Sequence, residues 1–162
     1  MLIAKTIIHE CIHAYLNIKL CDPTIGMDIP SINNMDVQNV INMNYNGFRP
    51  NTQDQHDFIY NFMLPTMQTI LFQVKDLLVT PTQNSDMLTL TMHITEGASG
   101  TPFNWTDAYI NLSLSGLQNC NFFKNEIATF DTQGNITTTV NSSKTASFIQ
   151  YNNYLKNYLN KN

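Results

Sequence analysis

A single helical repeat runs through the first twenty residues, and it constrains the fold more than any other feature of the sequence. Apolar side chains recur at intervals of three and four residues, at Ile3, Ile7, Ile8, Cys11, Ile12, Tyr15, Leu16 and Ile18. This spacing predicts a helix from Leu2 to about Leu20, with most of its circumference covered and Cys11 in the core. Asp22-Pro23 predicts its end, because proline cannot continue a helix and biases the preceding residue toward extended geometry.

A second helical stripe follows after a long interruption. Residues 23–52 are rich in Asn, Asp, Pro and Gly, and they predict an irregular connection with one short helical turn near residues 36–43. Long connections of this kind in compact domains often carry function. The second stripe runs from about Thr52 to Leu78. Pro65 lies inside it, so we expect a kink or a split into two helices there.

The patterns change after Pro81, where helical spacing gives way to alternation and turn residues. The stretch MLTLTMHI alternates apolar and polar residues, as half-buried strands do, and the glycine of TQGN suits a hairpin turn. We expect, in order, a strand or an extended segment at Met87–Ile94, a loop at Gly97–Pro102, a helix at Trp105–Gln118, a hairpin at Glu126–Val140 and a helix from Phe148 to Leu159.

Composition is that of a folded, single-domain protein. The chain has 162 residues, of which 43% are hydrophobic and 12% charged, and its net charge is −4. Disordered chains combine low hydrophobicity with high net charge, and this chain has neither. We predict one α+β domain over residues 1–162, dominated by helices with a small hairpin or sheet. The net charge argues against a nucleic-acid partner, and no apolar run is long enough to predict a membrane span.

The first helix carries a pattern with chemical meaning, His9-Glu10-x-x-His13. Residues four apart lie on the same face of a helix, so His9 and His13 can present two imidazoles to one metal ion. Glu10 follows His9 directly, which places its carboxylate beside the ion, where it can take a proton from a water molecule that the ion activates. The sequence therefore predicts a site for one zinc ion, with Glu10 as the general base of a hydrolase. An ordinary core helix with two hydrogen-bonded histidines is the alternative.

A catalytic zinc ion usually has three protein ligands, and the sequence offers few candidates for the third. We predict His56, because it opens the second helix, and the start of a helix is a rigid platform. Asp57, His93 and Glu96 are the alternatives, and His93 in its alternating segment is equally well explained as a strand residue. Asp54 or Asp57 could orient the His56 ring, although acids are also favoured in any first helical turn. Tyr60 could polarise a substrate carbonyl, but a packed helix tyrosine is the better interpretation.

The cysteines add no metal site. Cys11, Cys21 and Cys120 are an odd number, lie far apart, and form no CxxC pair. A disulfide between Cys21 and Cys120 is left open, since the sequence does not establish an oxidising compartment.

Two segments, TIIHECIHAYL and QHDFIYNFM, resemble zinc metallopeptidases of Bacteroidetes that are SprT-like or, more broadly, zincin-like. The resemblance implies a zincin-like fold, a peptide or protein substrate, and a zinc ion held by His9, His13 and His56 beside Glu10. Such proteins also tend to carry an L-x-W-G-G-L-x-x-T stretch, where this chain has LSLSGLQNC. Leu114 replaces the tryptophan and Ser115 the first glycine, which puts a role for that loop in doubt.

The resemblance raises a question about the N-terminus. Zincin-like domains usually place a small sheet before the motif helix, and its edge strand aligns the peptide substrate. Here the chain starts at Met1, next to that helix. We favour an N-terminally shortened sequence, and an export signal in the preceding part would place the protein in the cell envelope or outside the cell. Otherwise the strands expected near Met87–Ile94 and Ile127–Val140 supply the sheet.

Three functions compete on these observations. The leading hypothesis is a zinc-dependent hydrolase, most specifically a peptidase. The second is a domain that binds zinc without catalysis and serves binding or scaffolding, which the altered residues Leu114 and Ser115 suggest. The third is a surface-exposed binding module, suggested by glycosylation sequons at Asn104 and Asn135, which also arise by chance in an Asn-rich chain.

Overall fold

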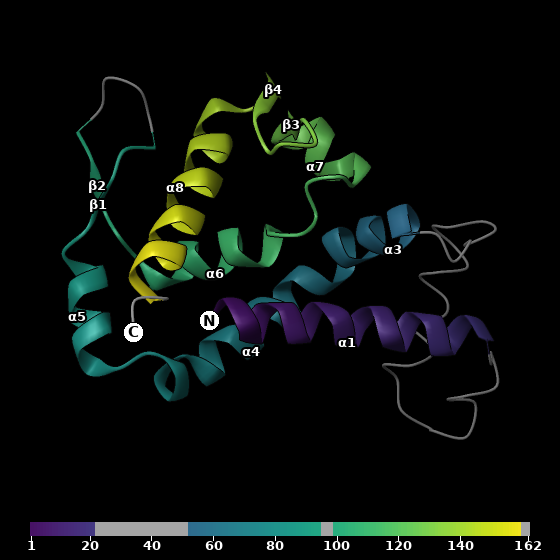
Figure 1. The fold of residues 1–162 in the computed structure, drawn as a ribbon, viewed down its shortest axis with the longest axis horizontal. Helices are drawn as coiled ribbons and strands as arrows, with labels where there is room; N and C mark the ends of the chain where they lie inside the picture. Colours follow the sequence, from purple (N-terminus) through teal and green to yellow (C-terminus); the bar gives the residue numbers. More distant parts are fainter. Residues whose placement is uncertain (22–51, 95–98, 160–162) are drawn as a thin grey trace.

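A computed structural model describes residues 1–21, 52–94 and 99–159. The described part is rich in helix and contains two small antiparallel strand pairs, which agrees with the expected α+β class. Figure 1 shows α1 along one side of the molecule, α6 and α8 stacked above it, and the two strand pairs well apart from each other. The connection predicted over residues 23–52 lies outside the described residues.

The first helix is confirmed as α1, Leu2–Cys21. It buries one stripe of side chains, Lys5, His9, Ile12 and Leu16. The expectation that most of its circumference is covered was wrong, because Ile3 and Ile7 are 77% and 57% exposed. Cys11 is also exposed rather than in the core, since it follows Ile7 by one turn on the same outward face.

The second helical stripe is split at the proline, as predicted. Helix α3, Thr52–Phe58, passes into a π-helical turn, η1, Ile59–Met63, and then into α4, Leu64–Leu78. Pro65 lies in the first turn of α4. Proline has no N–H to donate to the preceding turn, and a wider turn upstream accommodates this loss.

The strand predicted over Met87–Ile94 was largely wrong. Residues Pro81–Leu88 form helix α5, and only Thr91–Met92 are a strand, β1. The helix begins with a capping box, in which the Thr80 hydroxyl accepts from the Gln83 N–H at 3.2 Å and the Gln83 side chain accepts from the Thr80 N–H at 3.0 Å. These local hydrogen bonds, with proline at the first helical position, outweigh the alternating pattern.

Strand β1 pairs with β2, Thr101–Pro102, so the loop expected at Gly97–Pro102 ends in a short strand. The helix predicted after it is confirmed as α6, Trp105–Leu114, although it ends four residues before Gln118, where Ser115 is extended. Asn104 caps its start by accepting from the Asp107 N–H at 2.8 Å. A short helix that the sequence analysis missed, α7, Asn121–Glu126, comes next.

The predicted hairpin is confirmed as β3, Ala128–Phe130, and β4, Ile136–Thr139. Its turn contains Gly134 with φ +84°, a backbone conformation that favours glycine. The final helix, α8, Ser142–Leu159, starts six residues earlier than predicted. Asn141 lies just before it and accepts from the Lys144 N–H at 2.9 Å, as a cap does.

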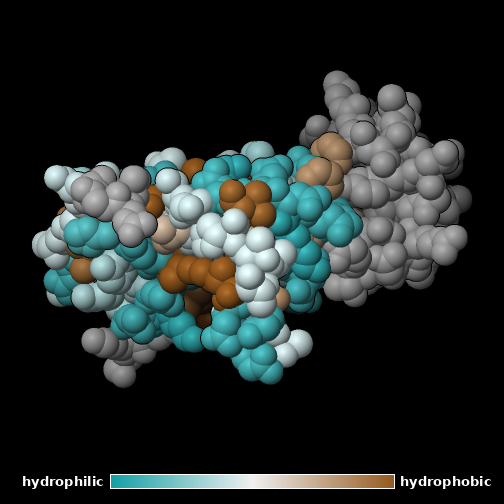
Figure 2. Space-filling view, turned by 90° about the horizontal axis from the view of Figure 1, so that it is seen from above, coloured by the Kyte–Doolittle hydropathy of each residue, from teal (hydrophilic) through white to brown (hydrophobic). Residues whose placement is uncertain are grey.

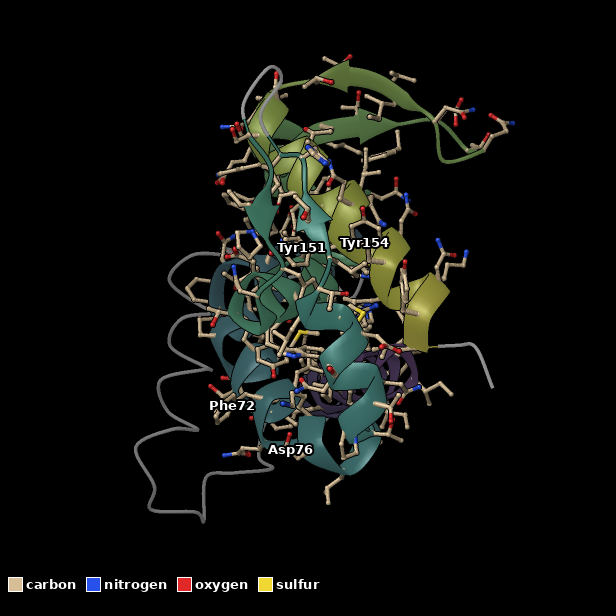
Figure 3. All side chains as sticks on the ribbon, turned by 90° about the vertical axis from the view of Figure 1, so that its left-hand side faces the viewer. Phe72, Asp76, Tyr151 and Tyr154 are labelled. Atoms are coloured by element: carbon tan, nitrogen blue, oxygen red, sulfur yellow. The ribbon has the colours of Figure 1, made fainter. Side chains whose placement is uncertain are left out.

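Within the described ranges, the core consists of two packed clusters that share Ile8 of α1. One cluster joins α1 to η1, α7 and β3, and the other joins α4, α5, α6 and α8. Tyr151 of α8 lies in the interior of the second cluster, while Phe72 and Asp76 lie on the outer side of α4 (Figure 3). Viewed from above, the surface is mostly hydrophilic, with one hydrophobic strip in a central hollow (Figure 2).

Candidate metal centre

The three histidines that the sequence selected meet at one place. His9 and His13 lie one turn apart on α1, and His56 reaches them from the last turn of α3, which lies beside α1 (Figure 1). The ring centroids are 4.7 Å apart for His9 and His13, 5.3 Å for His9 and His56, and 4.9 Å for His13 and His56. One nitrogen from each ring lies within 4.8 Å of the other two, so the cluster is close enough to bind one metal ion.

The spacing of the first two nitrogens suits a tetrahedral ion. His9 Nε2 and His13 Nε2 are 3.0 Å apart. Two nitrogens, each about 2.0–2.1 Å from an ion at a tetrahedral angle, lie about 3.3 Å apart. The helix therefore presents its two imidazoles at nearly the separation that coordination requires.

A hydrogen bond to Gln55 sets the tautomer of one candidate ligand, His13. His13 Nδ1 lies 2.5 Å from Gln55 Oε1, and the amide oxygen can only accept. The proton of neutral His13 is therefore on Nδ1, and its Nε2 lone pair faces the other two rings, where it accepts a hydrogen bond from His9 Nε2 at 3.0 Å. Such partners fix the tautomer and orientation of metal-binding imidazoles. Gln55 directly precedes His56, so α3 contributes both a candidate ligand and the residue that orients another.

The electrostatics of the cluster favour neutral rings, which metal ions require. His9 is only 5% exposed, and burial, with help from the charge of Lys5, lowers its pKa to about 3. Burial and the neighbouring His13 likewise lower the pKa of His56, although Asp57 and Glu10 oppose this shift. His9 Nδ1 is buried and has no hydrogen-bond partner among the residues that the structure describes.

Glu10, the predicted general base, is exposed on the outer side of the cluster. Its negative charge raises the pKa of both Lys5 and His56 against the effect of burial, so the carboxylate is within electrostatic range of each. Glu10 thus lies within electrostatic range of His56 and remains open to solvent.

The loop after α6, which follows Leu114 and contains Ser115 and Gly116, also borders the site. Gly116 has φ +95°, and a β-carbon on it would lie 3.1 Å from Lys5 Nζ, 3.6 Å from His9 Cε1 and 3.8 Å from His9 Nε2. A glycine is needed here for its backbone conformation, and its missing side chain leaves room for Lys5. The changes at Leu114 and Ser115 therefore do not separate this loop from the site.

The other candidate residues have different roles. The two carboxylate oxygens of Asp57 accept from the backbone N–H and side-chain amide of Asn121 at 2.8 and 2.9 Å, which ties the start of α7 to α3. His93 is exposed beyond β1, and its backbone N–H donates to Gln150 at 2.7 Å. Tyr60 donates to Glu126 at 3.0 Å and stacks on Phe122, which confirms its interpretation as a packed tyrosine.

Glu96 and the side chain of Asp54 lie outside the described residues. Cys120 is a free, buried thiol rather than half of the disulfide that the sequence left open. Its sulfur accepts from the Phe123 N–H at 3.2 Å and caps α7.

Three residues of the site escaped the sequence analysis, namely Lys5, Gln55 and Gly116. Lys5 had a visible signal, because it precedes His9 by four residues and interrupts the stripe that Ile12 and Leu16 continue. The other two had none, since their importance comes from contacts between distant parts of the chain.

No protein-family model matches the chain, and a search of curated proteins and of solved structures also finds no match. Among the described residues, no helix is both long and apolar enough to cross a membrane.

Proposed function

We propose that this chain is a zinc-dependent hydrolase of zincin-like type, and most specifically a peptidase. The observation that carries the proposal is the approach of His56 to the two histidines of α1, at ring distances of 5.3 and 4.9 Å. Two histidines one turn apart arise in many core helices. A third, brought to them from another helix beside an exposed glutamate, is the ligand set of a catalytic zinc site with a fourth position open.

The donor set fits zinc. Three uncharged imidazoles are borderline-soft ligands, and zinc accepts them without a strict geometric preference. His9, His13 and His56 would hold the ion, and Gln55 would keep the lone pair of His13 directed at it. A bound zinc ion would lower the pKa of its water ligand from about 15.7 to about 7.

Glu10 performs the proton transfers in this proposal. Its carboxylate accepts the proton of the attacking water and then delivers it to the leaving amine of the cleaved peptide bond.

The test combines metal content with turnover. We expect purified protein loaded with zinc to retain one ion per chain and to cleave casein or a peptide library. Glu10→Gln should retain the ion and lose activity by a factor of about 100 or more. Glu126→Gln, which alters an exposed glutamate bound to Lys144 at 3.2 Å, is the matched control and should remain active.

Two outcomes would redirect the assignment. Full activity of Glu10→Gln would remove this residue from the mechanism. Stoichiometric zinc without turnover of any peptide would favour the alternative of a zinc-bound domain that serves binding or scaffolding.

A further inference from the structure

Lys5 is a buried cation next to the candidate metal centre. It is only 6% exposed, and it lies on the buried stripe of α1, one turn before His9. Among the residues that the structure describes, its ammonium makes no hydrogen bond and no ion pair. Its Nζ is also not one of the described side-chain atoms that are fully buried without a partner, so the carbon chain of Lys5 is buried while the ammonium itself still reaches solvent and can meet a ligand there.

The ammonium lies close to the metal-binding nitrogens. Lys5 Nζ and His9 Nε2 are 3.1 and 3.8 Å from the same point, the position of a β-carbon on Gly116, so they are at most about 7 Å apart. The charge of Lys5 helps to lower the pKa of His9, which agrees with this proximity. Burial lowers the pKa of Lys5 itself, and Glu10 acts in the opposite direction.

Filling the site with a metal ion increases this imbalance of charge. A divalent ion on three neutral imidazoles would add two positive charges near the positive charge of Lys5, and the described carboxylates that oppose them are Glu10 and Asp57, one negative charge fewer than the three positive charges. The site would then carry excess positive charge in a partly water-excluded place, where an anion binds more strongly than it does in water.

We propose that Lys5 binds a carboxylate of the substrate, immediately beside the bond that is cleaved. This rests on the proposed function. An ammonium and a carboxylate in contact are separated by about 2.7–2.9 Å, and one extended residue spans about 3.3–3.6 Å. A carboxylate held by Lys5 therefore places the carbonyl of the next residue about 6–7 Å from Nζ. His9 Nε2 lies at most about 7 Å from Nζ, so this carbonyl can reach the candidate metal centre.

Two groups can supply this carboxylate. The free α-carboxylate of a C-terminal residue would make the enzyme remove single residues from the end of a peptide. The side chain of an aspartate or glutamate next to the cleaved bond would instead give an internal cleavage preference. Both sources use the same contact with Lys5, and peptide substrates distinguish them.

The first experiment measures binding without turnover. Zinc-loaded wild type, Lys5→Met, Lys5→Arg and the surface control Lys144→Met are titrated by calorimetry with N-acetylglycine and with its uncharged amide. Methionine is unbranched and close to lysine in length, so it suits the buried position. We expect Lys5→Met to bind N-acetylglycine about 10- to 100-fold more weakly, with Lys5→Arg intermediate and Lys144→Met unchanged.

The affinity for zinc separates this role from a structural one. Removing a positive charge near the ion should leave the zinc affinity of Lys5→Met equal to that of wild type or increase it. A merely structural lysine would weaken zinc and carboxylate binding together. Weaker carboxylate binding together with equal or stronger zinc binding supports the proposal, and a parallel loss of both affinities overturns it.

The second experiment uses matched peptides with a free C-terminal carboxylate or an amide, and with glutamate or glutamine next to the cleaved bond. We expect wild type to prefer a carboxylate in one of the two places, and Lys5→Met to lose that preference through KM. An equal fall in kcat for all four peptides would overturn the proposal, because Lys5 would then act on the reacting carbonyl instead. If wild type binds no zinc, the proposed function fails. If wild type binds zinc, and Lys5→Met binds N-acetylglycine as tightly as wild type does, only the proposed role of Lys5 fails.

Discussion

Replacing Gly116 by alanine tests the packing of the loop after α6 against the candidate metal centre. Gly116 and Gly134 have similar backbone conformations, with φ +95° and +84°. Their surroundings differ, because a β-carbon on Gly116 would lie 3.1 Å from Lys5 Nζ, whereas one on Gly134 would meet no atom within 4 Å. Gly134→Ala therefore measures the backbone strain alone, and Gly116→Ala measures the same strain together with the contact.

The size of each effect follows from these surroundings. An alanine in a left-handed conformation costs about 1–2 kcal/mol, and its smaller freedom in the unfolded chain returns about 0.4–1 kcal/mol. Gly134→Ala should thus lower the free energy of unfolding by about 1 kcal/mol. Gly116→Ala should lose about 1–2 kcal/mol more, because the buried Lys5 must move from a contact at 3.1 Å. The contacts with His9, at 3.6 and 3.8 Å, are of ordinary length and leave that ring in place.

Urea unfolding of the metal-free proteins measures both effects. With a slope of about 2 kcal/mol per molar urea, the midpoint should fall by about 0.5 M for Gly134→Ala and by about 1–1.5 M for Gly116→Ala. Zinc stoichiometry should be unchanged in both. Equal losses in the two variants would refute the close approach of Gly116 to Lys5, and two proteins as stable as wild type would refute the backbone argument.

Three further predictions concern the histidines. In metal-free protein, burial lowers the pKa of His9 to about 3, so as the pH falls below 6.5 only the unfolded chain binds a proton at this residue. The free energy of unfolding should therefore fall by about 1.4 kcal/mol per pH unit because of His9. Urea unfolding at pH 6.5 and 5 measures this, and His9→Leu should lack this part of the pH dependence. Gln55→Leu removes the acceptor of the His13 Nδ1 proton, so the zinc affinity of this variant should fall about 10- to 100-fold. A competition assay with a chelating dye measures the affinity, and an unchanged value would contradict the assigned tautomer. In thermal unfolding, free zinc at 100 times its dissociation constant should stabilise wild type by about 2.7 kcal/mol, and EDTA should reverse this stabilisation. The same zinc concentration should stabilise His56→Ala much less.

The elements predicted from local patterns were mostly confirmed. Helix α1 and the division of the second stripe at Pro65 follow from side-chain spacing and from proline, which act within a few residues. The strand expected at Met87–Ile94 failed for an equally local reason, because Thr80 and Gln83 form a capping box that starts α5 before the alternating segment. The exposure of Cys11 depends instead on which side of α1 the rest of the molecule covers, and periodicity alone does not contain that information.

The amino-acid sequence by itself determined that His9 and His13 share a face and that Glu10 stands next to them. These relations hold in any α-helix, because they depend only on its 3.6-residue turn. Tertiary packing decided that the His56 and His9 ring centroids lie 5.3 Å apart, that Gln55 bonds to His13, and that Gly116 lies against the end of Lys5. Each of these contacts joins segments more than 40 residues apart, and only the burial of the shared core brings such segments together.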